Sequence, residues 1–319
     1  MNNNVDKWNI SIVGAGTMGT SLALFYALSG YHTKVYNRTA ENLKKAEIQV
    51  ASSLDTLVQA GEVQQNDTER ILSNLSYFTD LEKAVQDTDY VIENVSEKKD
   101  IKIEIFKKLD QFCSQECILA SNTSTFNIYE FIHVSNPDRL VITHYLNPAH
   151  IMPIVEIIRG EKTSGECVDL LKEFFVHVKK SPIVMNKCIE GFIWNRLQMA
   201  LGREATYLVD EGLATVEDID TAMKCLAPRY LLRGIFTMYD FNGIDILNSV
   251  FDSVFPTLCN AVTSPKCIMN KVSKGELGIK TGRGFNDYSN EDIQKVIGDG
   301  EQKLLDIVRY AKKNIWQDQ

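Results

Sequence analysis

The sequence predicts an α/β fold, in which a doubly wound, mostly parallel sheet is followed by an all-helical domain. Three observations support this prediction. Short β-rich runs alternate with helical runs through the first 186 residues, a glycine-rich turn follows the first run, and strand signals nearly vanish after Asn186. We therefore expect a sheet domain over residues 1–186 and a helical domain over residues 187–319. The length agrees, because a single core rarely organises 319 residues.

Composition is that of a globular protein with a large core, since 44% of the residues are hydrophobic. The net charge of −8 provides no basic face for nucleic acid. No apolar run is long enough to cross a membrane and residues 1–7 are polar, so we expect a cytoplasmic protein. The seven cysteines are scattered without a C-x-x-C pair, which indicates buried thiols and implies neither a metal site nor a disulfide framework.

The first predicted strand and helix enclose a nucleotide-binding motif. The β-rich run WNISIV (residues 8–13) precedes G-x-G-x-x-G at residues 14–19, and a buried helix follows over residues 21–28. Gly14 permits a tight turn, Gly16 lets the backbone approach a pyrophosphate, and Gly19 lets helix and strand pack closely. The helix N-terminus attracts the anion. This order predicts a Rossmann-type site for a nicotinamide or flavin dinucleotide. Its expected contacts are Gly14, Gly16, Thr17, Met18 and Gly19.

The end of the second predicted strand, residues 33–36, bears on the choice of cofactor. An acidic residue there would bind the adenosine ribose, but the chain has Asn37 and Arg38 instead. Arg38 could pair with a 2′-phosphate and so favour NADP. Equally, it could stack on the adenine or point into solvent, so both NAD and NADP stay open.

The remaining elements of the first domain alternate between helix and strand. Glu93, Ser121, Asn122 and His144 fall at or just beyond predicted strand ends, where a parallel sheet binds its ligands. The expected elements are a long polar helix from residue 43 extended through 72, a strand ending at 93, a helix over 99–112, strands over 117–120 and 140–143, a helix over 167–178 and a strand over 182–185.

The second domain is expected to be helical throughout. Predicted helices cover residues 190–209, 216–226, 229–239, 244–254 and 256–262. Residues 275–285 contain too much glycine for a helix and predict a loop. Lys280 and Arg283 in this loop could contact an anionic ligand, or the loop could simply be solvated.

A histidine and a carboxylate are predicted to face each other in a hairpin. His144 follows the run LVIT, Glu156 lies in a second β-rich run, and both are equidistant from position 150. If the chain reverses there, the two side chains lie opposite each other. A carboxylate that holds an imidazole creates a positioned general base. Alone, the pair also fits an ordinary hairpin without chemistry.

Taken together, these motifs resemble a known family, the L-3-hydroxyacyl-CoA dehydrogenases, including 3-hydroxybutyryl-CoA dehydrogenases. GAGTMG resembles the family's opening fingerprint, and ASNTS, HYLNP and IVEII resemble its A-S-N-T-S-S, H-F-F-N-P and L-V-E-V stretches. ENVSE followed by Lys102 resembles E-A-V-x-E…K, residues 191–197 resemble G-F-x-x-N-R, and residues 278–285 resemble G-x-K-T-G-x-G-F. The resemblance covers nearly the whole chain.

The resemblance implies a role for each matched residue. His144 would remove the 3-hydroxyl proton of an acyl-CoA substrate while hydride passes to NAD, and Glu156 would orient His144. Ser124 and Asn195 would bind the substrate oxygen or the histidine. A homodimer is also expected. The residues implied to line the cofactor and coenzyme A channel are Glu97, Lys102, Asn122, Asn147 and Lys280.

Other functions remain open at this point. A relative acting on a hydroxy acid without coenzyme A, such as carnitine or gulonate, would share the scaffold. A basic patch of Lys44, Lys45 and Lys102 favours coenzyme A, unless these lysines form a solvated helix face. A non-catalytic nucleotide-binding protein would not need His144 with its partners. The β-hydroxyacid dehydrogenases would place lysine where Asn195 follows Gly191.

Overall fold

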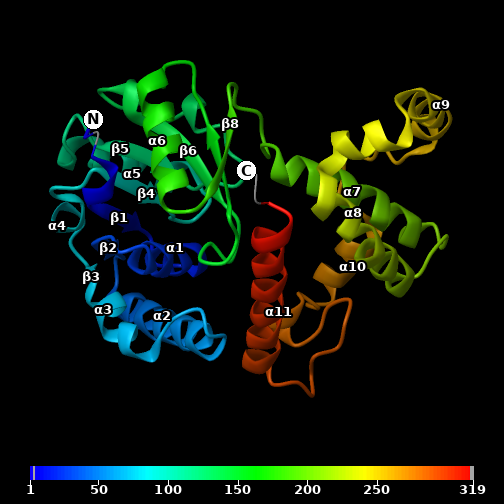
Figure 1. Cartoon of the computed structure of the whole chain (residues 1–319), viewed down its shortest axis with the longest axis horizontal. Helices are drawn as coiled ribbons and strands as arrows, with labels where there is room; N and C mark the ends of the chain where they lie inside the picture. Colours follow the sequence, from blue (N-terminus) through cyan, green and yellow to red (C-terminus); the bar gives the residue numbers. More distant parts are fainter. Residues whose placement is uncertain (3, 317–319) are drawn as a thin grey trace. The chain divides into compact units, whose positions relative to one another are not determined.

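The structure is a computed structural model, and it describes residues 1–2 and 4–316. The chain divides into two compact units, Met1–Asn195 and Arg196–Gln319. Figure 1 shows a sheet flanked by helices in the first unit and helices joined by loops in the second. The predicted fold class is therefore confirmed. The domain boundary proposed from the sequence, between residues 186 and 187, precedes the division between the units.

The sheet of the first unit has the strand order β3-β2-β1-β4-β5-β6-β7-β8. Neighbouring strands are parallel except β6 and β7, which are antiparallel. The carboxyl ends of β1, β4, β5 and β6 therefore meet at one edge, whereas β7 and β8 end at the opposite edge. The strands are β1 (Ile10–Val13), β2 (Thr33–Tyr36), β3 (Leu75–Phe78), β4 (Tyr90–Glu93), β5 (Ile118–Ser121), β6 (Leu140–Tyr145), β7 (Ile154–Ile158) and β8 (Ser181–Met185).

Alternate residues of the strands pack into two hydrophobic cores, one on each face of the sheet. Ile10 and Ile12 of β1 join one core with α1 (Thr17–Leu28) and α6 (Gly165–His177). Val13 joins the other core with α4 (Leu81–Val85) and α5 (Lys99–Phe112). On β6, Tyr145 packs in the core with α1 and Ile142 packs in the core with α5. Because side chains of a strand alternate between the two faces, His144 lies on the same face as Ile142, the α5 side.

The predicted long helix through residues 43–72 is wrong. Helix α2 (Ala40–Gln59) ends before Gly61, whose φ of +73° is left-handed. A 3₁₀ turn, η2 (Gln65–Asp67), and a short helix, α3 (Thr68–Ser73), follow. Strand β3 was not predicted, because its four residues bury no full side chain and only pairing with β2 makes them a strand.

The second unit consists of α7 (Trp194–Asp210), which begins two residues before it, α8 (Val216–Asn242), α9 (Ile244–Val254), α10 (Lys266–Ser273) and α11 (Ile293–Asn314). In its loops lie the 3₁₀ turns η5 (Phe255–Thr257) and η6 (Ile279–Thr281). The prediction for α9 is confirmed. Within the described residues, no helix has the length and apolar character needed to cross a membrane.

Three helix predictions near or within this unit are wrong. Helix α7 starts at Trp194 rather than residue 190, because Gly191 and Phe192 have positive φ values. Helix α8 continues through Pro228 and is interrupted at Gly234 instead, where φ is 66°. The predicted helix over 256–262 is only η5. Helix α10, which was not predicted, follows where the Asp210 carboxylate accepts the amides of Lys266 and Cys267.

Candidate active site

The glycine loop after β1 has the shape that a dinucleotide phosphate requires. Gly14 has a φ of +114°, and a Cβ there would lie 2.5 Å from the Asn94 carbonyl oxygen. A Cβ on Gly19 would overlap the Gly14 carbonyl, whereas a Cβ on Gly16 would meet nothing within 4 Å. Gly16 is also the N-cap of α1 and caps the helix with no side chain. The first-turn amides of α1 are therefore open to an anion, and these residues fit NAD.

His144 and Glu156 face each other across β6 and β7, as predicted. The two residues are register partners, and His144 Nδ1 lies 2.7 Å from Glu156 Oε2. Both side chains are buried. Because the carboxylate accepts from Nδ1–H, it leaves Nε2 as the nitrogen that can take a proton.

The Glu156 carboxylate is held by more than the histidine. Its Oε1 accepts the backbone amides of Ile193 (3.0 Å) and Trp194 (2.8 Å) at the start of α7. Each bond to a charged group contributes about 1.5–3 kcal/mol, which offsets the cost of burying the carboxylate. The Phe192 ring packs edge-on to His144, with 5.4 Å between ring centroids. The sequence did not reveal these amides, because the predicted helix began too early.

Ser124 and Asn195 are brought together, although they lie far apart in the sequence. Asn195 Nδ2 donates to the Ser124 carbonyl oxygen at 2.8 Å. The Ser124 amide in turn donates to Glu97 Oε1 at 3.1 Å. The Ser124 hydroxyl has no protein partner in the part of the chain that the structure describes, so it is available to a ligand.

Asn122 joins the loop after β5 to the catalytic strand. Its Oδ1 accepts the amide of Tyr145, the residue after His144, at 2.9 Å, and its Nδ2 donates to Asn94 Oδ1 at 2.7 Å. The side chain therefore links the carboxyl ends of β4, β5 and β6. It lies at the edge where the glycine loop lies.

Lys102 lies inside the first unit and not on its surface. It is 1% exposed, and its Nζ lies 2.8 Å from Glu93 Oε1 and 3.1 Å from Glu97 Oε2. Lys44 and Lys45 pair instead with Glu47 and Glu41. The predicted basic patch of Lys44, Lys45 and Lys102 is therefore wrong. The buried Lys102 ammonium is paired with two carboxylates, and each of the other two lysines is paired with a glutamate of its own helix.

The two carboxylates around Lys102 differ in environment. Complete burial raises the pKa of Glu93, against the opposing effects of Lys102 and the Ser121 hydroxyl. Burial also opposes the charge of Glu97, but hydrogen bonds from Thr123, Lys102 and Ser124 lower its pKa below the ordinary value. The sequence indicated Glu97 and Lys102 but not Thr123, whose hydroxyl donates to Glu97.

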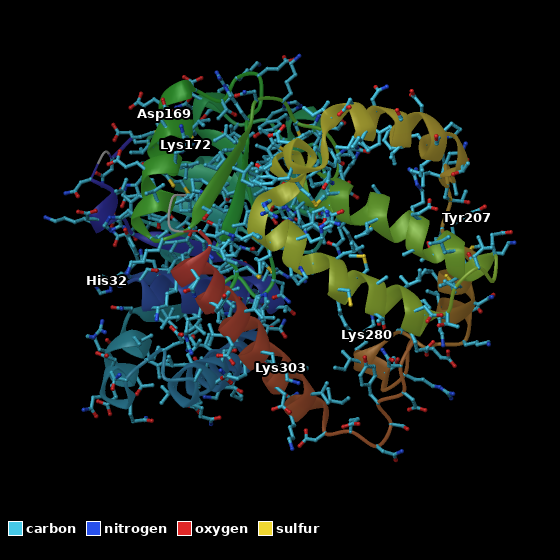
Figure 2. The ribbon with its side chains drawn as sticks, turned by 45° about the vertical axis from the view of Figure 1, so that its right-hand side comes forward. His32, Asp169, Lys172, Tyr207, Lys280 and Lys303 are labelled. Atoms are coloured by element: carbon cyan, nitrogen blue, oxygen red, sulfur yellow. The ribbon has the colours of Figure 1, made fainter. Side chains whose placement is uncertain are left out.

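The other predicted cofactor residues are more exposed. Asn37 Oδ1 accepts the Thr39 amide at 3.3 Å in the turn before α2. Arg38 is exposed and, within the described residues, forms no side-chain hydrogen bond or ion pair. Asn147 is exposed in the turn after β6. Lys280 is exposed in η6 of the second unit, where Figure 2 labels it.

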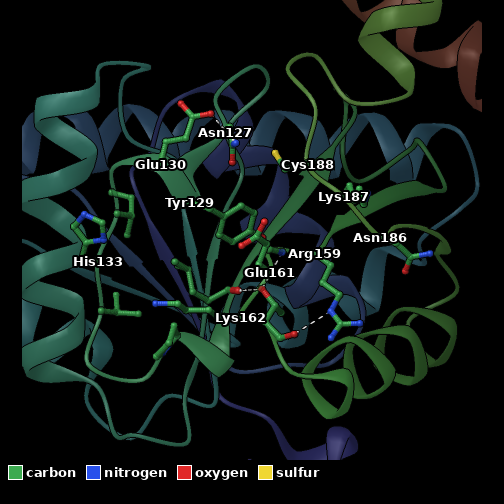
Figure 3. Close-up of a pocket in the computed structure, with 16 residues that line it drawn as sticks. Asn127, Tyr129, Glu130, His133, Arg159, Glu161, Lys162, Asn186, Lys187 and Cys188 are labelled. Carbon is green, nitrogen blue, oxygen red and sulfur yellow. Dashed lines mark hydrogen bonds between the residues drawn. The ribbon is translucent and has the colours of Figure 1, made fainter.

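A pocket of about 700 Å³ lies elsewhere in the first unit (Figure 3). It is formed by segments before β6 and after β7 and β8, at the edge opposite the glycine loop. None of the predicted catalytic residues lines it. The lining residues are Asn127, Tyr129, Glu130, Ile132, His133, Val134, Pro137, Leu140, Arg159, Gly160, Glu161, Lys162, Thr163, Asn186, Lys187 and Cys188.

Comparison with known proteins connects this geometry to a family. Residues 9–188 match the family model described as 3-hydroxyacyl-CoA dehydrogenase, NAD binding domain. Residues 191–288 match 3-hydroxyacyl-CoA dehydrogenase, C-terminal domain. The two models together span most of the chain.

Individual relatives fall into two groups by their names. The chain is 31% identical to the 5-formyl-3-hydroxy-2-methylpyridine 4-carboxylate 5-dehydrogenase of Mesorhizobium japonicum, over 94% of this chain and 97% of the relative. It is 33% identical to a probable 3-hydroxybutyryl-CoA dehydrogenase of Bacillus subtilis, over 88% and 98%.

Two solved structures repeat this division. One, of the pyridine carboxylate dehydrogenase named as an NAD⁺-dependent dismutase, has a TM-score of 0.87 at 30% identity, covering 96% of this chain and 99% of that one. A second, (S)-3-hydroxybutyryl-CoA dehydrogenase from Ralstonia eutropha, has a TM-score of 0.71 at 31% identity, covering 89% and 99%. The chain belongs to the 3-hydroxyacyl-CoA dehydrogenase family and is an NAD-dependent oxidoreductase.

Proposed function

We propose that this enzyme oxidises a secondary alcohol to a ketone, with His144 as the general base. The observation that supports this most is the buried contact of 2.7 Å between His144 Nδ1 and Glu156 Oε2. NAD, when bound at the glycine loop, supplies the hydride acceptor. The role of the protein is then to position the hydroxyl and to take its proton.

His144 Nε2 accepts the hydroxyl proton as the carbonyl forms, and in the reverse direction it returns that proton. The imidazolium that results is stabilised by the buried Glu156 carboxylate. Because two backbone amides also hold Glu156, neither member of the pair needs to reorganise during the step. A positioned base of this kind contributes about 10²- to 10⁴-fold in rate.

Ser124 and Asn195 are proposed to orient the substrate oxygen. The Asn195 amide nitrogen is committed to the Ser124 carbonyl, which leaves Asn195 Oδ1 and the Ser124 hydroxyl for the ligand. Family membership favours an L-3-hydroxyacyl-CoA as the substrate. Its thioester carbonyl, next to the reacting carbon, would bind the same polar groups.

A substrate without coenzyme A is the second candidate, and two observations favour it. The basic patch expected for the coenzyme A phosphates is not formed, because Lys102 is buried between two glutamates. The higher structural similarity is to the dehydrogenase named for a pyridine carboxylate, with a TM-score of 0.87 against 0.71. A small hydroxy acid or an aromatic carboxylate is therefore the alternative.

Steady-state assays of the purified full-length chain distinguish these substrates. The panel contains 3-hydroxybutyryl-CoA, carnitine, gulonate and 5-formyl-3-hydroxy-2-methylpyridine 4-carboxylate, each with NAD and NADP, and acetoacetyl-CoA with NADH and NADPH. With the active substrate, His144→Ala is expected to lower kcat by roughly a hundredfold or more while leaving NAD affinity unchanged. Near-native turnover in His144→Ala would show that His144 is not the base.

Cofactor choice is proposed to be NAD first, with NADP tolerated. No carboxylate stands at position 37 to repel a 2′-phosphate, and Arg38 lies beside it with its guanidinium free of protein partners among the described residues. Arg38→Ala should lower kcat/KM for NADP by about one to two decades, because a charge-assisted hydrogen bond contributes about 1.5–3 kcal/mol. The value for NAD should change little. An unchanged kcat/KM for NADP in Arg38→Ala would show that Arg38 does not bind the 2′-phosphate.

We also propose that the chain forms a homodimer through the second unit. Its helices α8 and α9 expose large apolar side chains to an unusual degree, with Phe236 at 81%, Phe241 at 70% and Ile244 at 66%. Exposed apolar surface of this extent marks an interaction site, and a second copy is the partner that symmetry most often provides.

A further inference from the structure

The turn between β6 and β7 is bonded to the helix that follows the glycine loop. His150, the midpoint of the turn, lies six residues from both His144 and Glu156. Its Nδ1 lies 2.8 Å from Ser21 Oγ of α1, and its backbone amide donates to the same oxygen at 3.3 Å. One serine therefore contacts both the side chain and the backbone of His150.

A buried lysine, Lys180, holds the same turn through two further hydrogen bonds. Lys180 Nζ donates to the carbonyl oxygens of Ala149 and Met152, which flank His150 in the turn. The ammonium also lies 4.1 Å from the centre of the Phe25 ring, one turn of α1 beyond Ser21. Lys180 is 6% exposed. Both ends of the turn are thus held against one face of α1.

This arrangement joins the two parts that hydride transfer must align. Ser21 lies four residues after Thr17, the first residue of α1, and so shares its face of the helix. The first turn of that helix is where the dinucleotide phosphate fits. His144 and Glu156 lie on the opposite face of the sheet from α1. The turn is continuous with the two strands that carry them and is hydrogen-bonded to α1, so it connects the helix to the pair.

We propose that His150, through its contact with Ser21, is a positioning residue that couples the cofactor helix to the His144–Glu156 hairpin. The inference rests on the proposed role of His144. Burial and the Lys180 charge lower the pKa of His150 to about 4, so its imidazole is neutral at physiological pH. The Nδ1 atom of a neutral ring can accept a hydrogen bond from the Ser21 hydroxyl.

The test compares Ser21→Ala and His150→Ala in the full-length enzyme. Each is expected to lower kcat roughly tenfold, because small displacements of reacting groups slow the chemical step, while the KM for NAD changes less than twofold. His150→Asn retains an acceptor near the position of Nδ1 and should recover much of the rate. Ser29→Ala is the control, since Ser29 bonds only to the Phe25 carbonyl of its own helix among the described residues.

Two further measurements separate positioning from simple destabilisation. The double variant Ser21→Ala/His150→Ala should be no slower than Ser21→Ala, because Ser21→Ala already removes the side-chain contact that His150→Ala removes. In hydrogen exchange, NAD should protect the backbone amides of residues 146–153 in the native chain and in Ser29→Ala, but much less in Ser21→Ala. This readout needs no substrate.

The inference is overturned if Ser21→Ala and His150→Ala keep kcat within twofold of the native value, or if their effects on kcat add independently. It is also overturned if NAD protects residues 146–153 equally in all variants. If His144→Ala keeps full turnover, the proposed base is wrong instead, and the exchange experiment still decides whether the turn responds to the cofactor.

Discussion

The two units of this enzyme differ in how they bury apolar side chains. In the first, both faces of the sheet carry fully buried cores that include Phe106, Phe174 and Phe175. In the second, the buried apolar residues of the described chain are only Met238, Leu305, Val308 and Ala311. Phe241 and Val262 there are 70% and 97% exposed. The first unit has the core of an independent domain, whereas the second leaves many large apolar side chains of its helices exposed.

The side chains that we propose for catalysis show the same division. His144, Glu156 and Ser124 are positioned by contacts inside the first unit. Within the described residues, the Ile193 and Trp194 amides and the Asn195 side chain link them to α7. We infer that the first unit holds both the cofactor and the base.

The largest effect is expected from removing the second unit together with the last nine residues of the first, 187–195. A fragment that ends near Asn186 should still bind NAD weakly but show no turnover, because the amides on Glu156 and the Asn195 side chain are gone. Calorimetry for NAD binding and a sensitive rate assay measure the two quantities. If the fragment turns over as fast as the whole chain, then either Asn195 has no role in the reaction or the proposed boundary between residues 186 and 187 is wrong.

A large loss of stability is expected from Lys102→Met, within the first unit. The substitution leaves the fully buried Glu93 carboxylate without its cation, and an unpaired buried charge of this kind costs about 3–5 kcal/mol. Chemical denaturation of the full-length chain measures the free energy of unfolding. Lys108→Met is the matched control, since its pair with Glu104 on the same helix is exposed and contributes little. Equal effects of the two variants would argue against a cooperative core around Lys102.

A change of assembly with little loss of fold is expected from Phe241→Glu in the second unit. A charge on an exposed apolar side chain leaves the monomer intact but opposes burial against a second copy. Light scattering coupled to size exclusion should show a dimer for the native chain and a monomer for the variant. A native chain that is monomeric at all accessible concentrations would require another partner for this surface.

The smallest effect is expected from Glu97→Gln, in the pH dependence of stability. Because the folded-state pKa of Glu97 is lowered from 4.5, its charged form stabilises the native state above pH 4.5, and this contribution is lost as the pH falls through the lowered pKa. Thermal unfolding between pH 7 and pH 3 should therefore fall less steeply in Glu97→Gln than in the native chain. Parallel curves would show that Glu97 titrates alike in the folded and unfolded states.

Much of the first unit could be predicted because its signals are local. The G-x-G-x-x-G turn has only one common use between strand and helix, and the period of two in β6 and β7 allows only one register once the chain reverses near residue 150. Strand β3 could not be predicted in this way. Its four residues are only half buried, so the edge of the sheet, and not their own pattern, makes them a strand.

The second unit was harder to predict because its helix ends depend on single backbone angles. Gly191 and Phe192 adopt positive φ and delay α7, while Gly234 interrupts α8 even though Pro228 is the more obvious breaker. An interior proline removes one amide and crowds the carbonyl four residues earlier, yet α8 continues through Pro228 and changes direction at Gly234. The sequence pattern does not show which of the two residues breaks the helix.

The sequence by itself determined the family, the order of the motifs and the opposition of His144 and Glu156, because each depends on residues near one another along the chain or on strand periodicity. The tertiary structure decided which charges are free. It buries Lys102 between Glu93 and Glu97, places the Ile193 and Trp194 amides on Glu156, and joins His150 to Ser21. These contacts link residues from 5 to 129 positions apart, and no local pattern encodes which partner will satisfy a buried polar group.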